Sequence, residues 1–180
     1  ALVRMTRMLK HRGPDGEGIW VDKNIGFGHR RLSIIDLSDS GKQPMANIQG
    51  NVILTFNGEI YNYRELRDEL IAKNYIFNSK SDSEVIIHLY EEEGRDCLKR
   101  LNGMFAFALW DATNQLLFLA RDRLGIKPIF YYFDGRYFRF ASEIKGMLAD
   151  NDIDRRVDSQ GLHNFLSFNY CTAPLTLFSG

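Results

Sequence analysis

The chain has 180 residues, and its 23 basic and 23 acidic side chains leave no formal net charge. This length is typical of one sizeable domain, or of one domain with a tail. A hydrophobic fraction of 44%, with 13% aromatic residues, supports a packed core and excludes a disordered chain. Because the charges cancel, the composition gives no sign of a nucleic-acid partner or of an anionic membrane surface.

The sequence also indicates a compartment. It contains no apolar run of the roughly 18–20 residues that span a bilayer, and its first residues lack the cleavage site of a signal peptide. The two cysteines, Cys97 and Cys171, lie too far apart in sequence to suggest a disulfide framework. We therefore expect a cytoplasmic protein with free thiols and no membrane partner. The four histidines lack ligand spacing, so we expect no metal site.

The first elements in chain order are a helix and two strands. Apolar residues at helical spacing predict a helix over 3–10. A strand is predicted over 25–35 and is followed by a polar loop. The β-rich run 51–56 is predicted to end at Asn57-Gly58, a pair typical of turns.

Two helices should follow. Asn62, with Glu65 three residues later, has the spacing of a capping box at a helix start. Ser81 and Glu84 repeat that spacing for the next helix, which Gly94 should close. The apolar face of this second helix comprises Val85, Ile86, Leu89 and Tyr90.

Two hairpins are predicted in the second half, pairing 104–110 with 116–120 and 129–133 with 137–141. Their apolar runs are nearly continuous, so both faces of these strands should be covered. Ser142 should open a last short helix. This order of helices and antiparallel strands indicates an α+β fold.

Arg31 stands on a predicted strand, which would hold its guanidinium rigidly enough to grip a carboxylate through two parallel hydrogen bonds. The alternative is a structural ion pair with an acid such as Asp36.

Asn57-Gly58 offers a side-chain amide and an unobstructed backbone N–H in adjacent positions. Two such donors form a minimal oxyanion hole for amide cleavage. The alternative is a plain turn, and the neighbouring Glu59 could simply satisfy backbone donors.

Asp82 lies at a predicted helix start, where an acid is favoured by the helix dipole, and it could equally serve as counterion for an ammonium group. A guanidinium for a carboxylate, an acid for an ammonium and paired donors for a carbonyl oxygen together describe a site for a free amino acid with a reactive side-chain amide. That amino acid is glutamine.

Six motifs of this sequence, in order, resemble the glutaminase domain of asparagine synthetases, which are class II (N-terminal-nucleophile) glutamine amidotransferases. They are His11-Arg12-Gly13-Pro14-Asp15, Arg31 to Asp36, Asn57 to Asn62, Ser81 to Glu84, Gly103 to Asp111 and Arg121 to Pro128. The resemblance spans roughly residues 1–150. It implies a four-layer α-β-β-α sandwich of the N-terminal-nucleophile hydrolase type, here lacking its first strand.

The resemblance also implies roles for particular residues. Arg31 matches the residue that binds the glutamine α-carboxylate, and Asn57 and Gly58 match the oxyanion donors. Glu59 and Asp82 match the acids near the α-amino group. The stretch that lines the site continues through Leu32, Ser33, Ile34 and Ile35. The nucleophile of this family is an N-terminal cysteine, which is absent from these 180 residues, so we expect the chain alone to be inactive.

We expect residues 1–149 to form an N-terminally incomplete type-2 glutamine amidotransferase domain, and 150–180 to form a linker and the start of a truncated synthetase domain. L-glutamine and the synthetase domain of the same full-length chain are the expected partners, and a homodimer is possible in this family. The glutaminase domain needs no cofactor, whereas the synthetase domain implies ATP and Mg²⁺. The alternative is a non-catalytic module of the same fold that binds glutamine or a protein partner.

Overall fold

The computed structural model describes residues 1–32, 35–36 and 38–179. Helices and antiparallel strands are mixed along the chain, so the predicted α+β class is confirmed. The elements are α1 (Leu2–Met8), β1 (Gly16–Asp22), β2 (Ile25–Arg31), η1 (Asp39–Gly41), β3 (Met45–Ala46), β4 (Val52–Ile60), α2 (Tyr63–Ala72), α3 (Asp82–Glu93), η2 (Gly94–Lys99), β5 (Gly103–Asp111), β6 (Leu116–Arg121), β7 (Phe130–Phe133), β8 (Phe138–Ala141), α4 (Ile144–Met147) and α5 (Ser159–Phe168), where η marks a 3₁₀ helix.

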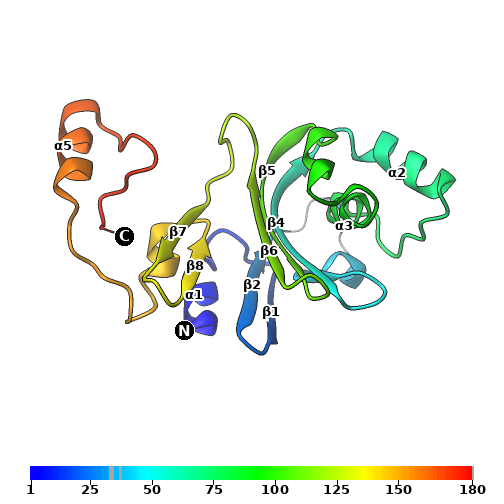
Figure 1. The fold of residues 1–180 in the computed structure, drawn as a ribbon, viewed down its shortest axis with the longest axis horizontal. Helices are drawn as coiled ribbons and strands as arrows, with labels where there is room; N and C mark the ends of the chain where they lie inside the picture. Colours follow the sequence, from blue (N-terminus) through cyan, green and yellow to red (C-terminus); the bar gives the residue numbers. More distant parts are fainter. Residues whose placement is uncertain (33–34, 37, 180) are drawn as a thin grey trace.

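The described strands form three antiparallel sheets. Strands β3-β4-β5-β6 form a four-stranded sheet in that order, and β1–β2 and β7–β8 are separate hairpins. Helices α2 and α3 lie on one side of the four-stranded sheet, while both hairpins and α1 lie on the other (Figure 1). The four-stranded sheet is therefore the central layer, and it separates two different environments.

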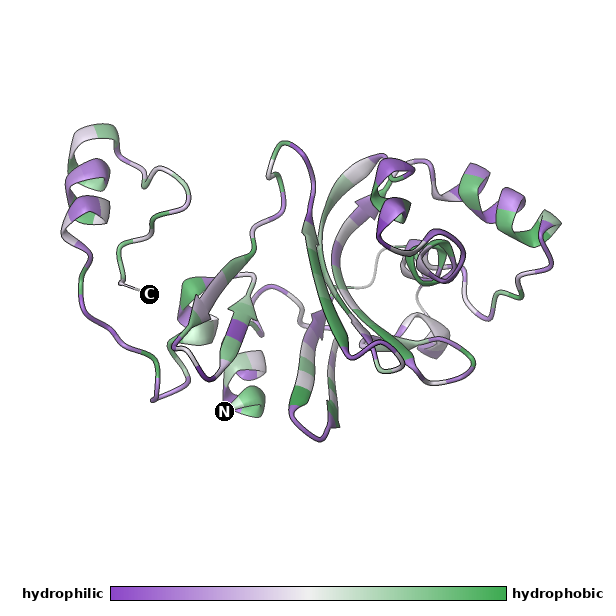
Figure 2. Cartoon of the chain, in the orientation of Figure 1, coloured by the Kyte–Doolittle hydropathy of each residue, from purple (hydrophilic) through white to green (hydrophobic). Residues whose placement is uncertain are grey.

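Strands β4 and β5 divide the core between those two sides, because successive side chains of a strand point to opposite faces. Leu54 and Phe107 belong to the larger core cluster, which packs against α2 and α3. Ile53 and Trp110 belong to a second cluster, which includes Phe27 of β2. Figure 2 shows the apolar residues running along this sheet, with polar residues in the loops at its periphery. Each fully buried aliphatic or aromatic side chain contributes about 1.5–3 kcal/mol.

The expectation that both hairpins are covered on both faces is confirmed for β5 and wrong for β7–β8. The side chains of Tyr131, Phe133 and Phe138 are 58%, 56% and 44% exposed. Among the described residues no layer covers their outer face, and the rings pack on one another instead: Tyr131 stacks on Phe138 with centroids 5.8 Å apart. A continuous apolar run therefore does not reveal how many faces are covered.

The predicted turn at Asn57-Gly58 is wrong, because β4 continues through both residues to Ile60. The partner β5 makes the difference, since Gly58 pairs with Phe105. A Cβ at position 58 would lie 2.2 Å from the Met104 carbonyl oxygen and 2.7 Å from the Phe105 Cα. Glycine is needed here for a close approach of two strands. The strand predicted over 25–35 also ends earlier than expected, at Arg31.

The helix caps follow the sequence in part. The Ser81 side chain accepts a hydrogen bond from the Ser83 N–H, and Gly94, at φ 59°, closes α3 as predicted. Asn62 precedes α2 but makes no capping hydrogen bond. Its side chain instead donates to the Arg100 carbonyl and accepts from the Asn102 N–H, so a tertiary contact replaces the local cap.

Residues beyond 149 begin with turns and continue into α5, which lies beyond the β7–β8 hairpin at the far end of the molecule (Figure 1). The Asp158 carboxylate caps α5 by accepting from the Gly161 N–H at 2.6 Å. The domain boundary at 149 stays a prediction. Among the described helices none has the length and apolar character needed to cross a bilayer.

We expect Gly58→Ala to lower the free energy of unfolding by about 1–3 kcal/mol, because the new methyl group would collide with the β5 backbone. Urea unfolding followed by circular dichroism measures this change. Gly16→Ala is the matched control, since a Cβ there meets only the Arg31 Cβ at an ordinary 3.6 Å. Equal stability of the two variants would contradict this account of Gly58.

Candidate functional site

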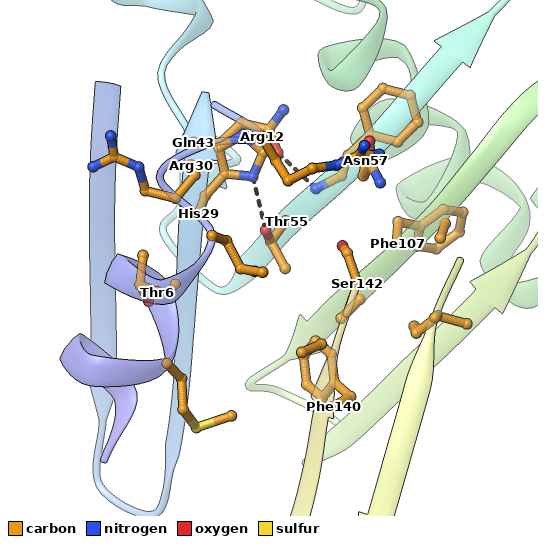
Figure 3. Close-up of a pocket in the computed structure, with 18 of the residues that line it drawn as sticks. Thr6, Arg12, His29, Arg30, Gln43, Thr55, Asn57, Phe107, Phe140 and Ser142 are labelled. Carbon is orange, nitrogen blue, oxygen red and sulfur yellow. Dashed lines mark hydrogen bonds between the residues drawn. The ribbon is translucent and has the colours of Figure 1, made fainter. Parts of the chain in front are cut away.

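A cavity of about 1030 Å³ lies between β1–β2, the four-stranded sheet, the start of α3 and the β7–β8 hairpin. Figure 3 shows lining side chains that come from β2, β4, β5 and β8, among them His29, Asn57 and Phe140. Every described residue of the predicted glutamine site lines this one cavity, namely Arg31, Leu32, Ile35, Asn57, Gly58, Glu59 and Asp82. Ser33 and Ile34 lie outside the described residues. The fold thus brings together side chains that are up to about fifty positions apart in sequence.

Arg31 is half-buried at the end of β2, and the loop that follows it holds its guanidinium. Nη1 donates to the Ser38 carbonyl at 2.9 Å, and Nη2 donates to the Asp36 carbonyl. The suggested pairing with an acid is therefore replaced by bonds to backbone oxygens. Because guanidinium carries five N–H donors, these contacts orient the group and leave further donors for an anion.

The Asp36 carboxylate points the other way and fixes the loop. It accepts from the Ser38 N–H and hydroxyl at 2.8 and 2.6 Å and from the Lys80 N–H at 2.9 Å. These hydrogen bonds, that of the Ser38 hydroxyl first, lower the Asp36 pKa to about 2. Asp36 is therefore ionised and joins the Arg31 loop to the segment before α3.

The free edge of β4 carries the second feature of the site. Strand β3 covers only the first part of this edge, and side chains take over where it ends. Phe56 N–H donates to the Gln43 side-chain oxygen at 2.6 Å, and Ile60 N–H donates to Asp82 Oδ2 at 2.9 Å. Gly58 lies between these two residues, so its N–H points to the same edge, because hydrogen-bonding direction alternates along an antiparallel strand.

The partner strand supports this orientation of Gly58. Phe105, opposite Gly58, directs both its N–H and its carbonyl away from β4, to the Asp122 carboxylate and the Asp122 N–H. Among the described residues the Gly58 N–H therefore has no acceptor, and the Asn57 side-chain amide has no hydrogen-bond partner either. Two adjacent donors face a cavity, which is the arrangement that stabilises a developing oxyanion.

Asp82 and Glu59 supply negative charge to the same cavity. Asp82 is only 4% exposed, and burial raises its pKa against the hydrogen bond from Ile60. It lies in the first turn of α3, so the helix-start interpretation is also correct. Glu59 is half-buried, and its carboxylate has no hydrogen-bond partner among the described residues. A bound cation would compensate the buried Asp82 carboxylate.

His29 is a cavity residue that the sequence analysis did not select. Its Nδ1 lies 3.2 Å from the Thr55 hydroxyl across the gap between β2 and β4 (Figure 3). Burial, with help from the nearby charges of Arg31 and Arg30, lowers its pKa to about 4. His29 is therefore neutral at pH 7 and contributes a polar, uncharged side chain to the cavity lining. The sequence signal for this role is its place on the predicted strand 25–35, two residues before Arg31.

Comparison with known proteins assigns the chain to a family. The family described as "Glutamine amidotransferase domain" matches residues 1–180. The chain belongs to this family. Among curated proteins it is 46% identical over 180 residues to "Asparagine synthetase [glutamine-hydrolyzing] 3" of Bacillus subtilis, covering 98% of this chain and 29% of that protein. The predicted resemblance is thereby confirmed.

Two further relatives of this amidotransferase domain carry similar names. A putative glutamine-hydrolysing asparagine synthetase of Mycobacterium tuberculosis is 41% identical over 193 residues, covering 100% of this chain and 29% of the relative. A second putative enzyme, from Methanocaldococcus jannaschii, is 38% identical over 195 residues, covering 97% and 37%. The chain thus spans well under half the length of the curated relatives it matches.

Solved structures agree with this fold. The glutamine phosphoribosylpyrophosphate amidotransferase of B. subtilis aligns with a TM-score of 0.59 and 24% identity, covering 69% of this chain and 29% of that one. A structure titled as the allosteric regulatory enzyme of purine biosynthesis aligns at 0.58 and 26% identity, with the same coverage. These matches support the chain fold of an amidotransferase domain.

Neither cysteine of this amidotransferase domain lines the cavity. Cys97 is buried in η2, and burial raises its pKa to about 12. Cys171 lies near α5, where its Sγ is 3.4 Å from the Gly161 carbonyl. Within the described residues no three His, Cys, Asp or Glu side chains gather as metal ligands do.

His29 should make stability depend on pH. Its folded pKa of about 4 lies below the ordinary value of 6.5, so the unfolded chain takes up the proton first. His29 therefore favours the folded state above pH 6.5, and this contribution is lost as the pH falls towards 4. We expect His29→Asn, which cannot titrate, to flatten the pH dependence of the free energy of unfolding in that window by up to about 3 kcal/mol.

Urea unfolding at a series of pH values between 4 and 7 measures this difference. His163→Asn is the control for the substitution itself, since His163 is exposed on α5 and does not line the cavity. An identical pH dependence in the wild-type chain and His29→Asn would show that the neutral form of His29 is not favoured by folding.

Proposed function

We propose that this chain is the glutamine-hydrolysing, ammonia-supplying domain of an asparagine synthetase. The single observation that carries the proposal is the convergence of Arg31, the Asn57-Gly58 donors and Asp82 on one cavity. These groups complement the carboxylate, the amide oxygen and the ammonium of a single glutamine molecule. The identity to asparagine synthetases supports asparagine synthesis as the use of the ammonia.

Each residue has a role in this proposal. Arg31 grips the α-carboxylate of glutamine with the donors that its loop leaves free, and Leu32 and Ile35 line the same cavity. Ser33 and Ile34, which the proposal includes in this stretch, lie outside the described residues. Asp82 and Glu59 hold the ammonium group. With the amino acid fixed at both charged groups, its side-chain amide lies against the Asn57 Nδ2 and the Gly58 N–H, which stabilise the oxygen as it gains charge during attack.

The attacking group in this proposal is a cysteine thiol activated by an adjacent amine. Neither Cys97 nor Cys171 lines the cavity, so neither is that group. The thiol forms a thioester with the glutamine side chain and ammonia leaves; water then releases glutamate. The proposed architecture is the four-layer α-β-β-α sandwich of N-terminal-nucleophile hydrolases. Two observations favour it: helices flank the central sheet on one side, and hairpins with further helices lie on the other.

The remaining parts of the proposal concern the longer protein. The relatives are more than twice as long as this chain, which leaves room for a synthetase domain that uses ATP and Mg²⁺. That domain is the proposed partner, within a cytoplasmic protein in which Cys97 and Cys171 stay free. A homodimer is compatible with this arrangement.

A second candidate function is a glutamine-binding module without catalysis. It is favoured by the position of Cys97 and Cys171, neither of which reaches the cavity. Both candidates require glutamine binding, and they differ in whether the longer protein supplies the thiol.

L-glutamine should bind in the cavity, and Arg31→Lys should weaken that binding about tenfold or more, because a lysine cannot form two parallel bonds to a carboxylate. Titration followed by amide chemical shifts in NMR spectra measures dissociation constants even in the millimolar range. Arg64→Lys is the control, since Arg64 lies on α2 and does not line the cavity. An unchanged affinity in Arg31→Lys would contradict the assigned role of Arg31.

The 180-residue polypeptide should release no ammonia from glutamine, because no thiol of its own faces the cavity. A coupled glutamate dehydrogenase assay for ammonia, compared with a blank without protein, tests this. Turnover by this polypeptide would mean that another group acts as nucleophile, and the proposed thiol chemistry would be wrong.

A further inference from the structure

In the proposed function, Arg31 and Asp82 hold the two charged groups of the ligand. One short segment of the chain connects these two residues. This segment, residues 78–82, precedes and begins α3. At one end, the Lys80 N–H donates to the Asp36 carboxylate at 2.9 Å, and the Asp36 carbonyl accepts from Arg31. Two residues later, Asp82 itself lines the cavity and holds the Ile60 N–H. The position of this segment therefore sets the distance between the guanidinium and the carboxylate.

Glu84 anchors segment 78–82 from inside the helix. Its Oε1 accepts from the Asn78 N–H at 2.8 Å, and its Oε2 accepts from the Ser79 N–H at 2.7 Å and from the Ser79 hydroxyl at 2.6 Å. Burial alone would raise the Glu84 pKa, but the nearby His88 ring and hydrogen bonds from the anchored groups lower it to about 2. Hydrogen bonds to an ionised acceptor are about twice as strong as neutral ones, so this anchor is rigid.

The surroundings of Glu84 exclude a direct role in ligand binding. Glu84 is 7% exposed and does not line the cavity. Its titratable neighbour is His88, whose Nε2 lies 3.8 Å away and whose Nδ1 contacts Glu91 at 2.8 Å. Glu91 uses its other oxygen to accept from Asn47 and makes no contact with segment 78–82. Glu84 and Glu91 thus share a histidine but only Glu84 reaches the segment.

We propose that Glu84 is a positioning residue which, through segment 78–82, fixes the separation of Arg31 and Asp82 and so makes the site selective for an ammonium and a carboxylate on the same carbon. This rests on the proposed function, in which the cavity binds glutamine. A fixed spacing discriminates by geometry, because a ligand whose two charges are one carbon further apart cannot satisfy both groups at once.

The test compares two ligands with the 180-residue chain, L-glutamine and L-β-homoglutamine, whose charges are separated by one additional carbon. NMR titration gives both dissociation constants. We expect the wild-type chain to prefer L-glutamine by about tenfold or more. Glu84→Gln keeps the side-chain shape but sets an amide donor against a backbone N–H of the segment. It should weaken L-glutamine binding severalfold while changing β-homoglutamine little, so that the ratio falls towards one.

Glu91→Gln is the matched control, since it alters the same helix and the same histidine; its ligand ratio should stay at the wild-type value. If Glu84→Gln does not fold, Ser79→Ala supplies a second variant. It removes the hydroxyl that donates to Glu84 and accepts from the Ser81 N–H, both within the segment and its anchor, and it should lower the ratio in the same direction. Hydrogen exchange at the Lys80 and Ile60 amides should accelerate in the Glu84 and Ser79 variants and not in Glu91→Gln.

The outcomes separate this inference from the proposed function. A wild-type chain that binds neither ligand overturns the proposed function, and the inference with it. A chain that binds L-glutamine, but whose preference survives Glu84→Gln and Ser79→Ala, overturns only the inference. A preference that falls equally in Glu91→Gln also overturns it, because the effect would then belong to the packing of α3 as a whole.

Discussion

The site depends on the exposed edge of β4, beyond the point where the short strand β3 ends and β4 has no strand partner on that side. Strand β3 pairs only with residues 53 and 54, and beyond it the outward N–H groups of β4 must find other acceptors. Gln43 and Asp82 provide two of them, and between them the Gly58 N–H faces the cavity. A longer β3 would have covered this edge. Because β3 is short, the N–H groups of Phe56, Gly58 and Ile60 form a row of donors, and in the proposed function the Gly58 N–H is the one left for a ligand.

Charge is distributed in the cavity to suit a molecule with no net charge. Arg31 contributes a cation already oriented by two carbonyls, and Asp82 contributes a carboxylate whose pKa burial raises. His29, which lies on β2 two residues before Arg31, stays neutral because burial and two arginines oppose its protonation. A zwitterion that meets both charges relieves the cost of burying them, whereas a simple anion or cation relieves only one.

The sequence predicted which residues gather around one cavity better than it predicted the backbone that carries them. Arg31, Asn57 and Asp82 were selected because guanidinium, amide and carboxylate groups have few alternatives as ligand contacts. The local backbone at Asn57-Gly58 was predicted wrongly as a turn, because the reason for glycine lies in β5, almost fifty residues away. Asn62 failed as a cap for the same reason: its contacts at Arg100 and Asn102 are distant in sequence.

Glu84 illustrates the limit of local patterns most clearly. Its spacing from Ser81 predicts a capping box, in which it would bond to the N–H of Ser81. In the structure it reaches further back, to Asn78 and Ser79, and so holds a segment instead of a single helix end. The difference of two or three residues changes what the acid controls: a capping box stabilises one helix, whereas this anchor couples that helix to the Arg31 loop through Lys80 and Asp36. The same carboxylate thus connects secondary structure to the geometry of the cavity.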